Sequence, residues 1–459
     1  MAAMTRLCVF MIAWATATMV QYGFYISELN PLQEMLTCAP KARPGCLPLS
    51  LTTFGTVTAM FTAGGTVSSL ACGVVTRALG TGRRASLLAA AALSAAGALL
   101  LALSSSAFGL GSARLLQGLA AGIGVAVVPV YVKELAPPAV SGSVGVLNQV
   151  AVVAGIFAAQ AIGTYAVTTG ASWRRVPQAS LLLAVVQLVT GALWAVESPG
   201  WVEGEGAAVS GAGAPQQAAA LRERLWGDAA YERAPSEADD AARPREPTQM
   251  LSPLRDPAFR RALHVVALSQ LAQQLSGVNA IMYYSTGILS GLMPAMAPAL
   301  GLLITVVNGA MTFPPIWLIP EHRVGRKRLL VGSAGSMALF CTVLAYALLG
   351  AHAWLAGAAI LLVIAAFSVG LGPLPWVILP EVLPPESASL GASIGLGINW
   401  VANIAVAAGF QPLRRFLGAW DHNTGGLVFA VFAVANAAFA LALARVYQYE
   451  PPRRGGLPL

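Results

Sequence analysis

The stretch QQLSGVNAIMYYS, residues 273–285, lies inside an apolar run at 263–290 that is long enough to cross a bilayer. It contains two glutamines, an asparagine and two tyrosines, all of them uncharged hydrogen-bonding residues. Polar side chains in a membrane are costly unless they face the interior of a helix bundle or a water-filled path. Amides donate and accept hydrogen bonds, as hydroxyl groups do. The stretch therefore predicts a site for a polar, uncharged ligand such as a sugar or polyol.

The composition indicates a polytopic membrane protein. Of 459 residues, 57% are hydrophobic and only 10% are charged, and the mean hydropathy is +0.70, far outside the range of soluble globular chains. Apolar runs of about 20 residues match the ~30 Å hydrocarbon core of a bilayer. They predict an all-α fold of twelve transmembrane helices at 7–27, 51–75, 86–107, 111–132, 143–167, 178–196, 263–290, 297–319, 329–350, 354–380, 389–410 and 425–447.

The basic residues predict the orientation of these helices. The net charge is +8, and cytoplasmic loops of membrane proteins carry an excess of Lys and Arg. With both termini cytoplasmic, the opposite side holds only Lys41, Arg43, Arg174, Arg175, Arg414 and Arg415, and Arg114 lies within a helix. Of the 27 basic residues, 20 then remain cytoplasmic. The first apolar run lacks a cleavage site before Glu28, so we interpret it as a helix and not as a signal peptide.

The cysteines fall into two groups. Cys8, Cys72 and Cys341 lie in apolar runs, where packing is the expected role. Cys38 and Cys46 lie in the first outward loop, where an oxidising compartment permits a disulfide. The sequence leaves a disulfide and two free thiols equally open.

A polar segment divides the chain into two halves. We expect a six-helix bundle at 1–196, a cytoplasmic linker at 197–261, a second six-helix bundle at 262–447 and a cytoplasmic tail at 448–459. Within the linker, 216–227 predicts a short amphipathic helix, whereas the prolines of 234–248 exclude a long one. Transporters built from repeats bind substrate where the repeats meet, near the middle of the membrane.

The two halves carry similar motifs at matching places. Gly82-Arg83-Arg84 follows the second helix, and Gly325-Arg326-Lys327 follows the eighth. PVYVKELAP, residues 129–137, ends the fourth helix, and PWVILPEVLP, residues 375–384, ends the tenth. This correspondence six helices apart indicates an internal repeat.

These motifs, in this order, resemble those of the sugar porter family of the major facilitator superfamily, of the hexose or glucose transporter type. The family's helix-seven signature is similar to residues 273–285, and its helix-four motif is similar to residues 129–137. Its PES, GPxPW and NW motifs are similar to Val196-Glu197-Ser198-Pro199-Gly200-Trp201, to GPLPW at 372–376 and to Asn399-Trp400. The resemblance covers almost the whole chain and implies the major facilitator fold and sugar transport.

Carried over residue by residue, the resemblance implies a set of sugar contacts: Gln149, Gln273, Gln274, Asn279, Asn308 and Trp376, with Asn399 and Asn403 as further candidates. Their chemistry suits a sugar, because amides match hydroxyls and an indole face covers the apolar side of a pyranose. It also implies that Tyr283 and Tyr284 gate the outer side. The alternative for each amide is a hydrogen bond to a neighbouring helix and nothing more.

In the family, charge pairs at the cytoplasmic helix ends hold the inner side closed. The corresponding residues here are Arg83 and Arg84 with Glu134 and Glu197, and Arg326 and Lys327 with Glu381. Several family residues are replaced in this layer, at Thr76, Ser141, His322 and Ala388. We therefore expect a smaller barrier to inward opening than in relatives with the full set. The alternative is that exposed pairs contribute only ~0 to 1 kcal/mol.

Proton-coupled members of the family carry an aspartate on helix one, where this chain has Tyr25. A tyrosine with an ordinary pKa near ~10 does not titrate at physiological pH, which favours facilitated diffusion. Glu28, one turn further on, is expected to contact Arg114, since a lone cation in lipid needs a partner. A pair that opens would allow proton symport, whereas a static pair would be structural. Ser368 replaces a glutamate of some glucose carriers, so pentoses and polyols stay open as substrates.

Two other classes of function are less favoured. A sugar-sensing transceptor usually carries a long cytoplasmic tail, and only 448–459 follow the last helix. An enzyme is not indicated, because the sequence has no metal-ligand cluster, phosphate loop or nucleophile with a base. We thus expect no catalytic residue, no metal and no cofactor. The expected partners are a sugar, the lipid bilayer and, under the symport alternative, protons, with no nucleic acid, for a monomer in the plasma or vacuolar membrane.

Overall fold

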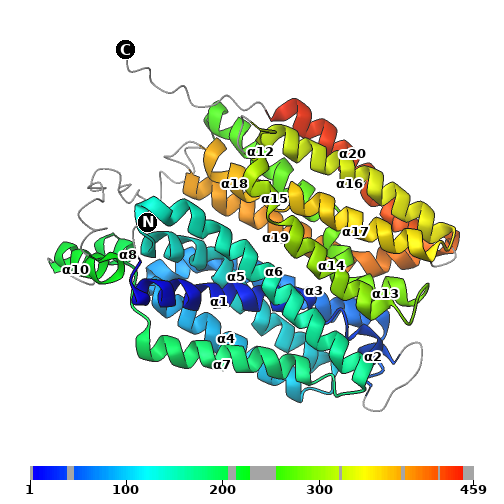
Figure 1. The fold of residues 1–459 in the computed structure, drawn as a ribbon, viewed down its shortest axis with the longest axis horizontal. Helices are drawn as coiled ribbons and strands as arrows, with labels where there is room; N and C mark the ends of the chain where they lie inside the picture. Colours follow the sequence, from blue (N-terminus) through cyan, green and yellow to red (C-terminus); the bar gives the residue numbers. More distant parts are fainter. Residues whose placement is uncertain are drawn as a thin grey trace.

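The computed structural model describes residues 4–38, 46–204, 213–227, 255–319, 323–383, 388–421 and 424–447. Every regular element in these ranges is a helix, as Figure 1 shows. Ten helical segments there are long and apolar enough to cross a membrane. The predicted all-α membrane fold is confirmed for the described part of the chain.

The first half and the linker contain nine of the named helices: α1 (Arg6–Ser27), α2 (Gln33–Thr37), α3 (Leu51–Leu79), α4 (Arg83–Leu103), α5 (Ala107–Leu135), α6 (Pro138–Thr169), α7 (Arg175–Trp194), α8 (Pro199–Glu203) and α10 (Ala214–Trp226). The second half contains α12 (Pro257–Gln274), α13 (Val278–Ser290), α14 (Ala297–Met311), α15 (Pro314–Leu318), α16 (Arg326–Leu349), α17 (Ala353–Val369), α18 (Leu374–Val382), α19 (Ala388–Asp421) and α20 (Gly426–Val446). The twelve predicted apolar runs all coincide with these helices.

Three of the twelve runs are divided, which the sequence reading did not foresee. The run 263–290 is split between α12 and α13, the run 297–319 between α14 and α15, and the run 354–380 between α17 and α18. Each break has a local cause, since glycine and proline end helices. The breaks lie at Gly277, at Thr312-Phe313 just before Pro314-Pro315, and at the segment from Gly370 to Pro373.

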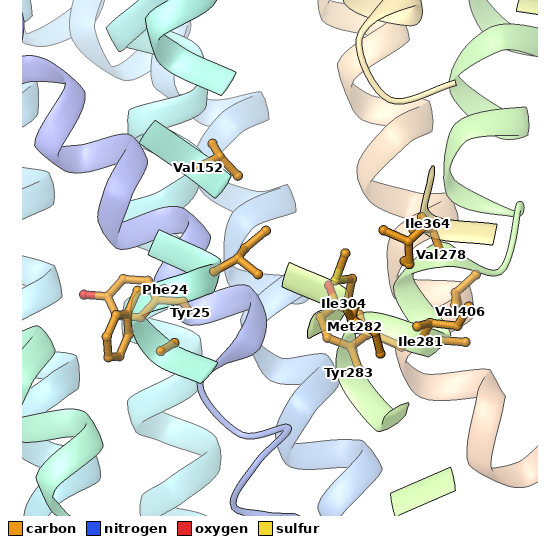
Figure 2. Packing of buried hydrophobic residues seen from close by; sticks show 14 of the residues in the cluster. Phe24, Tyr25, Val152, Val278, Ile281, Met282, Tyr283, Ile304, Ile364 and Val406 are labelled. Atoms are coloured by element: carbon orange, nitrogen blue, oxygen red, sulfur yellow. The ribbon is translucent and has the colours of Figure 1, made fainter. Parts of the chain in front are cut away.

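The described parts of the two halves meet chiefly along four helix pairs, α3 with α19, α6 with α14, α1 with α13 and α2 with α13. In Figure 1 the blue and cyan helices of the first half lie on one side of the molecule and the green to red helices of the second half on the other. Figure 2 shows buried side chains of both halves, among them Phe24 on α1 and Ile281 on α13. A continuous hydrophobic core thus extends across the boundary between the halves.

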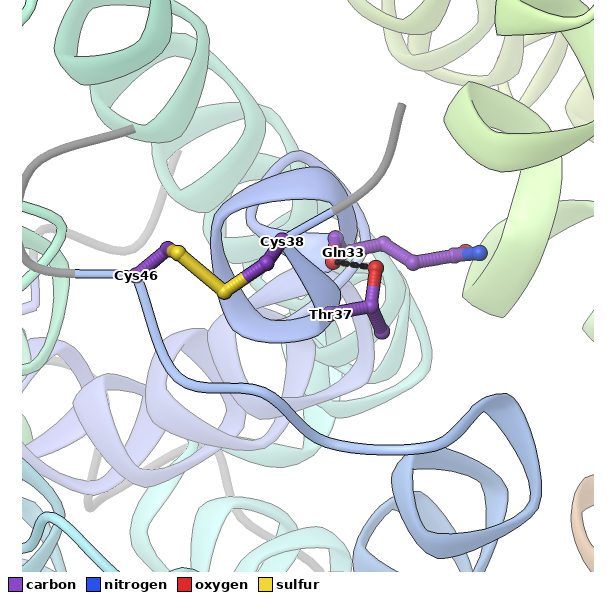
Figure 3. Close-up of a disulfide and its surroundings, with 4 residues drawn as sticks. All are labelled: Gln33, Thr37, Cys38 and Cys46. Carbon is purple, nitrogen blue, oxygen red and sulfur yellow. Dashed lines mark hydrogen bonds between the residues drawn. A yellow bond between two sulfur atoms is a disulfide. The ribbon is translucent and has the colours of Figure 1, made fainter. Parts of the chain in front are cut away.

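A disulfide is present on the face opposite the linker. It joins Cys38 to Cys46, whose Cα atoms lie 5.4 Å apart (Figure 3). The alternative with two free thiols, which the sequence left open, does not hold. The short helix α2 precedes the bridge, and its Gln33 side chain lies against Gly287 of α13. The bridge therefore directly follows a helix of the first half that lies against a helix of the second.

The linker helix α10 begins and ends within two residues of the predicted segment 216–227. Thr5 Oγ1, at the start of α1, donates hydrogen bonds to the carbonyl oxygens of Arg224 (3.0 Å) and Leu225 (2.8 Å). Trp226 Nε1 donates to the carbonyl of Leu135 at 2.9 Å. We call the side of the bundle where α8 and α10 lie the linker face. The predictions for 234–248 and for the tail at 448–459 fall outside the described residues.

Candidate functional site

The break between α12 and α13 places the polar groups of the signature stretch. Gly277 adopts φ +91°, a left-handed conformation that favours glycine, and a Cβ there would meet the Phe432 ring at 2.9 Å. The carbonyls left without helical partners are satisfied locally, since Ser276 Oγ donates to the Gln273 carbonyl (2.8 Å) and Asn436 Nδ2 donates to that of Ser276 (2.9 Å). Non-helical backbone at membrane depth is tolerated only where it is buried in protein or lines a cavity.

Around this break, side-chain amides from α12, α13 and α19 bond to one another. We call this group the amide cluster; its members are Gln270, Gln273, Gln274, Asn279, Asn399 and Asn403. Asn399 Nδ2 donates to Gln270 Oε1 and to Gln273 Oε1, both at 2.7 Å. Gln274 Nε2 donates to Asn399 Oδ1, and Asn403 Nδ2 donates to Gln274 Oε1, both at 2.9 Å. Asn279 Nδ2 also donates to Gln274 Oε1.

The amide cluster is held in place by the breaks in the helices. Gln273 Nε2 donates to the carbonyls of Leu371 (3.1 Å) and Gly372 (2.7 Å), which lie in the interruption between α17 and α18. The cluster carries no charge. Five of its six amides are buried, and Asn279 is partly exposed. Fixed amides that can exchange their mutual hydrogen bonds for bonds to hydroxyls form a suitable template for a neutral polyhydroxy ligand.

Two further predicted residues extend the polar region. Asn308 on α14 is buried, and its Oδ1 accepts a hydrogen bond from Ser368 Oγ at 2.8 Å. Tyr283 OH donates to Asn403 Oδ1 at 3.0 Å, which connects this predicted gate residue to the amide cluster. Tyr284 OH donates to the carbonyl of Ala407 at 2.9 Å, and its ring stacks on Phe410.

Gln149 and Trp376 are not joined to the amide cluster by a described hydrogen bond. Gln149 on α6 is half-buried, and Trp376 on α18 is exposed to 40%. Both side chains therefore have surface available for a ligand or for solvent. Their predicted role as sugar contacts stays a prediction.

Sequence reasoning missed two residues of this region, Gln270 and Ser368 as a hydrogen-bonding partner. Gln270 lies three and four positions before Gln273 and Gln274, which places all three on one face of α12. This spacing could have identified it. The bond from Ser368 to Asn308 joins α17 to α14, and a contact between distant helices has no signal in the sequence.

A second polar network, also missed, joins the halves on the face opposite the linker. We call it the outer network. Asn30 Nδ2 donates to Gln160 Oε1 (3.3 Å) and to Ser285 Oγ (3.0 Å), and Asn30 Oδ1 accepts from the backbone N–H of Thr286 (3.2 Å). Ser27 Oγ donates to the same Gln160 oxygen at 3.1 Å. The network joins α1 and α6 to α13 on this face.

The expected contact between Glu28 and Arg114 is present. Arg114 Nη1 lies 3.1 Å from Glu28 Oε2, and both side chains are almost completely buried. Arg114 also donates to Gln117 Oε1 (3.0 Å) and to the carbonyl of Tyr25 (2.8 Å), and it lies 4.6 Å from the centre of the Phe61 ring. The cation is thus satisfied on several sides, as a buried charge requires.

Two of the predicted pairs at the linker face form, one within each half. Arg83 Nη2 lies 3.5 Å from Glu134 Oε1, and Arg326 Nε lies 2.6 Å from Glu381 Oε2. Lys327 takes no part in the ion pairs described for this region.

Glu197 accepts hydrogen bonds from the backbone N–H of Arg84 at the start of α4 and from its neighbour Ser198. It lies so close to Gly82 that a Cβ there would meet its carboxylate at 2.1 Å. Burial raises the pKa of Glu197 above its usual range, while hydrogen bonds from the backbone and the charge of Arg83 oppose the shift. The negative charge is placed at the positive end of the α4 dipole.

Comparison with known proteins agrees with this arrangement. The sequence profile of the family described as "Sugar (and other) transporter" matches residues 1–447. The chain belongs to the sugar transporter family. The confirmed resemblance to sugar porters thus covers the fold and nearly the full length of the sequence.

Individual relatives of this sugar transporter family member are similar over most of their length. The chain is 30% identical to facilitated glucose transporter member 3 of solute carrier family 2 from Ovis aries, over 93% of this chain and 87% of that protein. It is 28% identical to the probable metabolite transport protein YBR241C of Saccharomyces cerevisiae, over 95% and 91%.

Among solved structures, the inward open xylose transporter XylE from E. coli superposes with a TM-score of 0.77 at 19% identity, covering 97% of this chain and 98% of that one. These likenesses establish a multi-pass membrane transporter of the major facilitator fold.

Proposed function

We propose that the chain carries a monosaccharide, with a hexose as the first candidate, across a membrane by facilitated diffusion. The observation that carries this proposal is the amide cluster, because it offers a buried, uncharged set of donors and acceptors at a helix break. A charged substrate would find no counter-ion among the six amides of the cluster. The facilitated glucose transporter that the chain resembles supports the substrate class.

The transport step is alternating access between the two halves. The halves 1–196 and 262–447 move as units, the linker face is cytoplasmic, and the outer network holds the opposite side closed. The hydrogen bonds of Asn30 to α6 and α13 support this role of the network. Sugar enters or leaves through the linker face and displaces bonds within the amide cluster. Breaking the outer network and closing the linker face then exposes the same site to the other side.

The remaining predicted residues complete the binding site. Gln149 faces the amide cluster from the first half, and Trp376 covers the apolar face of the sugar ring, since both retain accessible surface. Tyr283 acts as a gate because its hydroxyl bonds directly to Asn403 of the cluster. Binding of sugar to Asn403 therefore alters the contacts of the gate.

Uptake into proteoliposomes that contain the purified chain tests the proposal. Radiolabelled glucose is expected to equilibrate across the membrane without accumulating. Unlabelled substrate should compete with its uptake, and a proton uncoupler should have no effect on it. A panel of hexoses, pentoses and polyols as competitors identifies the substrate. Absence of saturable uptake for every member of the panel would contradict the proposal.

The Glu28–Arg114 pair favours proton-coupled sugar symport as a second candidate. The pair is buried, and Glu28 Oε1 accepts no hydrogen bond from the described residues, so one carboxylate oxygen is open to a proton. Protonation would release Arg114 to its other partners, Gln117 and the Tyr25 carbonyl. A pair that breaks in this way could link a proton to the change of conformation.

Uptake measured against pH in the wild type and in Glu28→Gln separates the two candidates. Under facilitated diffusion, uptake is non-concentrative and independent of a pH gradient in both proteins. Concentrative uptake driven by an inward proton gradient, lost in Glu28→Gln while equilibrative exchange persists, would establish symport instead.

A further inference from the structure

A cavity separate from the amide cluster lies at the linker face, between the start of α1, the end of α7 and the helix α10. Its volume is about 640 Å³. Its walls are formed by two arginines and six apolar residues: Arg6, Leu7, Phe10, Leu193, Trp194, Ala195, Val196 and Arg224. Figure 1 shows α10 beside the beginning of α1. Neither the amide cluster nor the pairs at the linker face use these residues.

The cavity continues into an apolar surface that faces away from the protein. On α7, Leu182, Val186, Val189 and Leu193 are each exposed by half or more, and their spacing places them on one side of the helix. In a chain that crosses a bilayer, such a stripe faces the acyl chains. Trp194, exposed to 58%, ends the stripe and packs edge-on against Phe10. Trp is enriched at this depth, at the boundary between acyl chains and headgroups.

The polar end of the cavity is cationic. The side chains of Arg6 and Arg224 are exposed and lie on its walls. A third arginine, Arg84, reaches the same helix end, where its Nη2 donates to the carbonyl of Ala192 at 3.2 Å. None of the described residues that line the cavity is acidic. Glu197, next to Val196, is bound to backbone N–H groups, and Glu223, next to Arg224, is exposed on α10 but does not line the cavity.

The position of Arg224 is fixed by the backbone and not by its own side chain. Thr5 Oγ1 donates to the Arg224 carbonyl, and Trp226 Nε1 anchors the same helix to the Leu135 carbonyl. Arg224 of α10 and Arg6 of α1 thus line the same cavity, and both side chains are exposed. Two arginines that line one cavity with no ion pair to the described residues suit an anion.

We propose that this cavity binds the phosphate headgroup of an anionic phospholipid from the leaflet at the linker face. The phosphate lies between Arg6 and Arg224, and the acyl chains follow the exposed stripe of α7. Basic pockets between membrane helices on the cytoplasmic side bind phospholipid headgroups in this manner. The proposal rests on the orientation given under the proposed function, which places the linker face at the more anionic leaflet.

A lipid fits the cavity better than a soluble phosphate does. The walls contain six apolar residues against two arginines, and Phe10 and Trp194 would remain in contact with water around a free anion. A phospholipid covers the apolar walls with its glycerol and upper acyl chains and pairs the arginines with its phosphate. The bound lipid also connects α1, α7 and α10, so it joins the linker to the first half.

Native mass spectrometry of the full-length protein tests the site. The protein is released from vesicles of phosphatidylcholine and phosphatidylglycerol, and the bound phosphatidylglycerol is counted over a series of lipid compositions. We expect the affinity for phosphatidylglycerol to fall about fivefold in Arg6→Gln and in Arg224→Gln and about 25-fold in the double variant. Each arginine near the membrane surface contributes a similar share of the binding free energy. The double lysine variant is expected to retain the lipid.

Arg445→Gln provides the matched control. Arg445 is an exposed arginine in the last turn of α20, at the end of a lipid-facing helix of the other half. Its loss is expected to leave the phosphatidylglycerol count unchanged. Equal loss in Arg445→Gln and in the double variant, or no loss in the double variant, would overturn the proposed site. Inorganic phosphate added to the same sample is expected to leave the lipid bound, and displacement would overturn the choice of a lipid.

The readout is independent of sugar transport. A protein that binds phosphatidylglycerol through Arg6 and Arg224 but moves no sugar contradicts the proposed function and leaves the lipid site standing. A protein that transports sugar equally with and without both arginines, and binds the lipid equally, contradicts the lipid site alone.

Discussion

Two buried polar regions, one in each half of the molecule, differ in kind. The first half holds an ion pair, Glu28 with Arg114, surrounded by helices on every side. The second half holds six amides that bond to one another and carry no net charge. From this difference we expect two roles. The neutral groups bind the substrate, and the charged groups respond to, or resist, changes of conformation.

The energies of the two regions differ accordingly. A buried charge that loses its partner costs about 3 to 5 kcal/mol, because it is left without solvation. An amide that loses one hydrogen bond costs about 1 to 3 kcal/mol when its partner stays buried. Substitutions in the ion pair should therefore act mainly on folding, and those in the amide cluster mainly on substrate affinity.

Arg114→Gln is expected to have the largest effect. It leaves Glu28 buried without its cation, so the folded state should lose about 3 to 5 kcal/mol. Thermal unfolding of the protein in detergent measures the loss, with the folded fraction at each temperature read by size-exclusion chromatography. The double variant Glu28→Gln with Arg114→Gln is expected to recover most of it, since no charge is then left unpaired.

Failure of the double variant to recover would mean that Arg114 acts through Gln117, Tyr25 or the Phe61 ring and not through Glu28. That result would weaken the comparison, because the first half would then contain a cation site and not an ion pair.

Asn399→Ala tests the neutral side of the comparison. Asn399 donates to Gln270 and Gln273 and accepts from Gln274, so its loss disturbs three members of the amide cluster. We expect kcat/KM for sugar uptake to fall about 10- to 100-fold, the equivalent of one or two hydrogen bonds. Proteoliposome uptake over a range of sugar concentrations measures the change.

Asn436→Ala is the control for Asn399→Ala. Asn436 is also a buried amide of the second half, but its Nδ2 donates to the carbonyls of Ser276 and Phe432. Its loss is expected to lower thermal stability and leave the half-saturating sugar concentration nearly unchanged. If both variants changed only stability, the amide cluster would be structural.

Much of this fold could be predicted from the sequence, because membrane helices can be recognised by their length and hydropathy. All twelve apolar runs coincide with helices, and the motif order identified the family that the profile match confirmed. The contact between Glu28 and Arg114 followed from the cost of a lone cation in lipid. These inferences depend on the properties of the lipid bilayer as a solvent and on local periodicity in the sequence.

The parts that could not be predicted depend on tertiary contacts. Hydropathy cannot separate one long helix from two joined at Gly277, since both give the same apolar run. The outer network needs Asn30 and Gln160, 130 residues apart, to lie beside Ser285 of the other half. No spacing rule brings such distant groups together. The disulfide between Cys38 and Cys46 was one of two equal alternatives until the distance was known.

Asn30→Ala tests the boundary between the halves. The substitution removes the bonds of Asn30 to Gln160, Ser285 and the Thr286 N–H, of which the last two cross to the second half. We expect a shift of about 1 to 2 kcal/mol, or about 5- to 30-fold, toward opening on the face opposite the linker. Modification of single cysteines introduced on each face measures the shift.

Thr168→Ala is a suitable control for Asn30→Ala, because Thr168 lies near the same face but bonds only within α6 in the described contacts, to the carbonyls of Thr164 and Tyr165. It is expected to leave the accessibility of both faces unchanged. An unchanged accessibility in Asn30→Ala as well would show that hydrophobic packing, and not the outer network, closes this face.

Glu197→Gln is expected to have the smallest effect, and it tests whether charge at the linker face of the first half depends on pH. Burial raises the pKa of Glu197 above its unfolded value, so the native protein binds this proton more readily than the unfolded chain. The stability from this group is complete below the unfolded pKa and is lost as pH rises through the raised native pKa. The melting temperature of Glu197→Gln minus that of the wild type should therefore increase as pH rises through this window.

Glu381→Gln, which removes the partner of Arg326 in the other half, is the control for a general charge effect. The same increase in both variants would mean that the burial of Glu197 does not distinguish the two linker-face carboxylates.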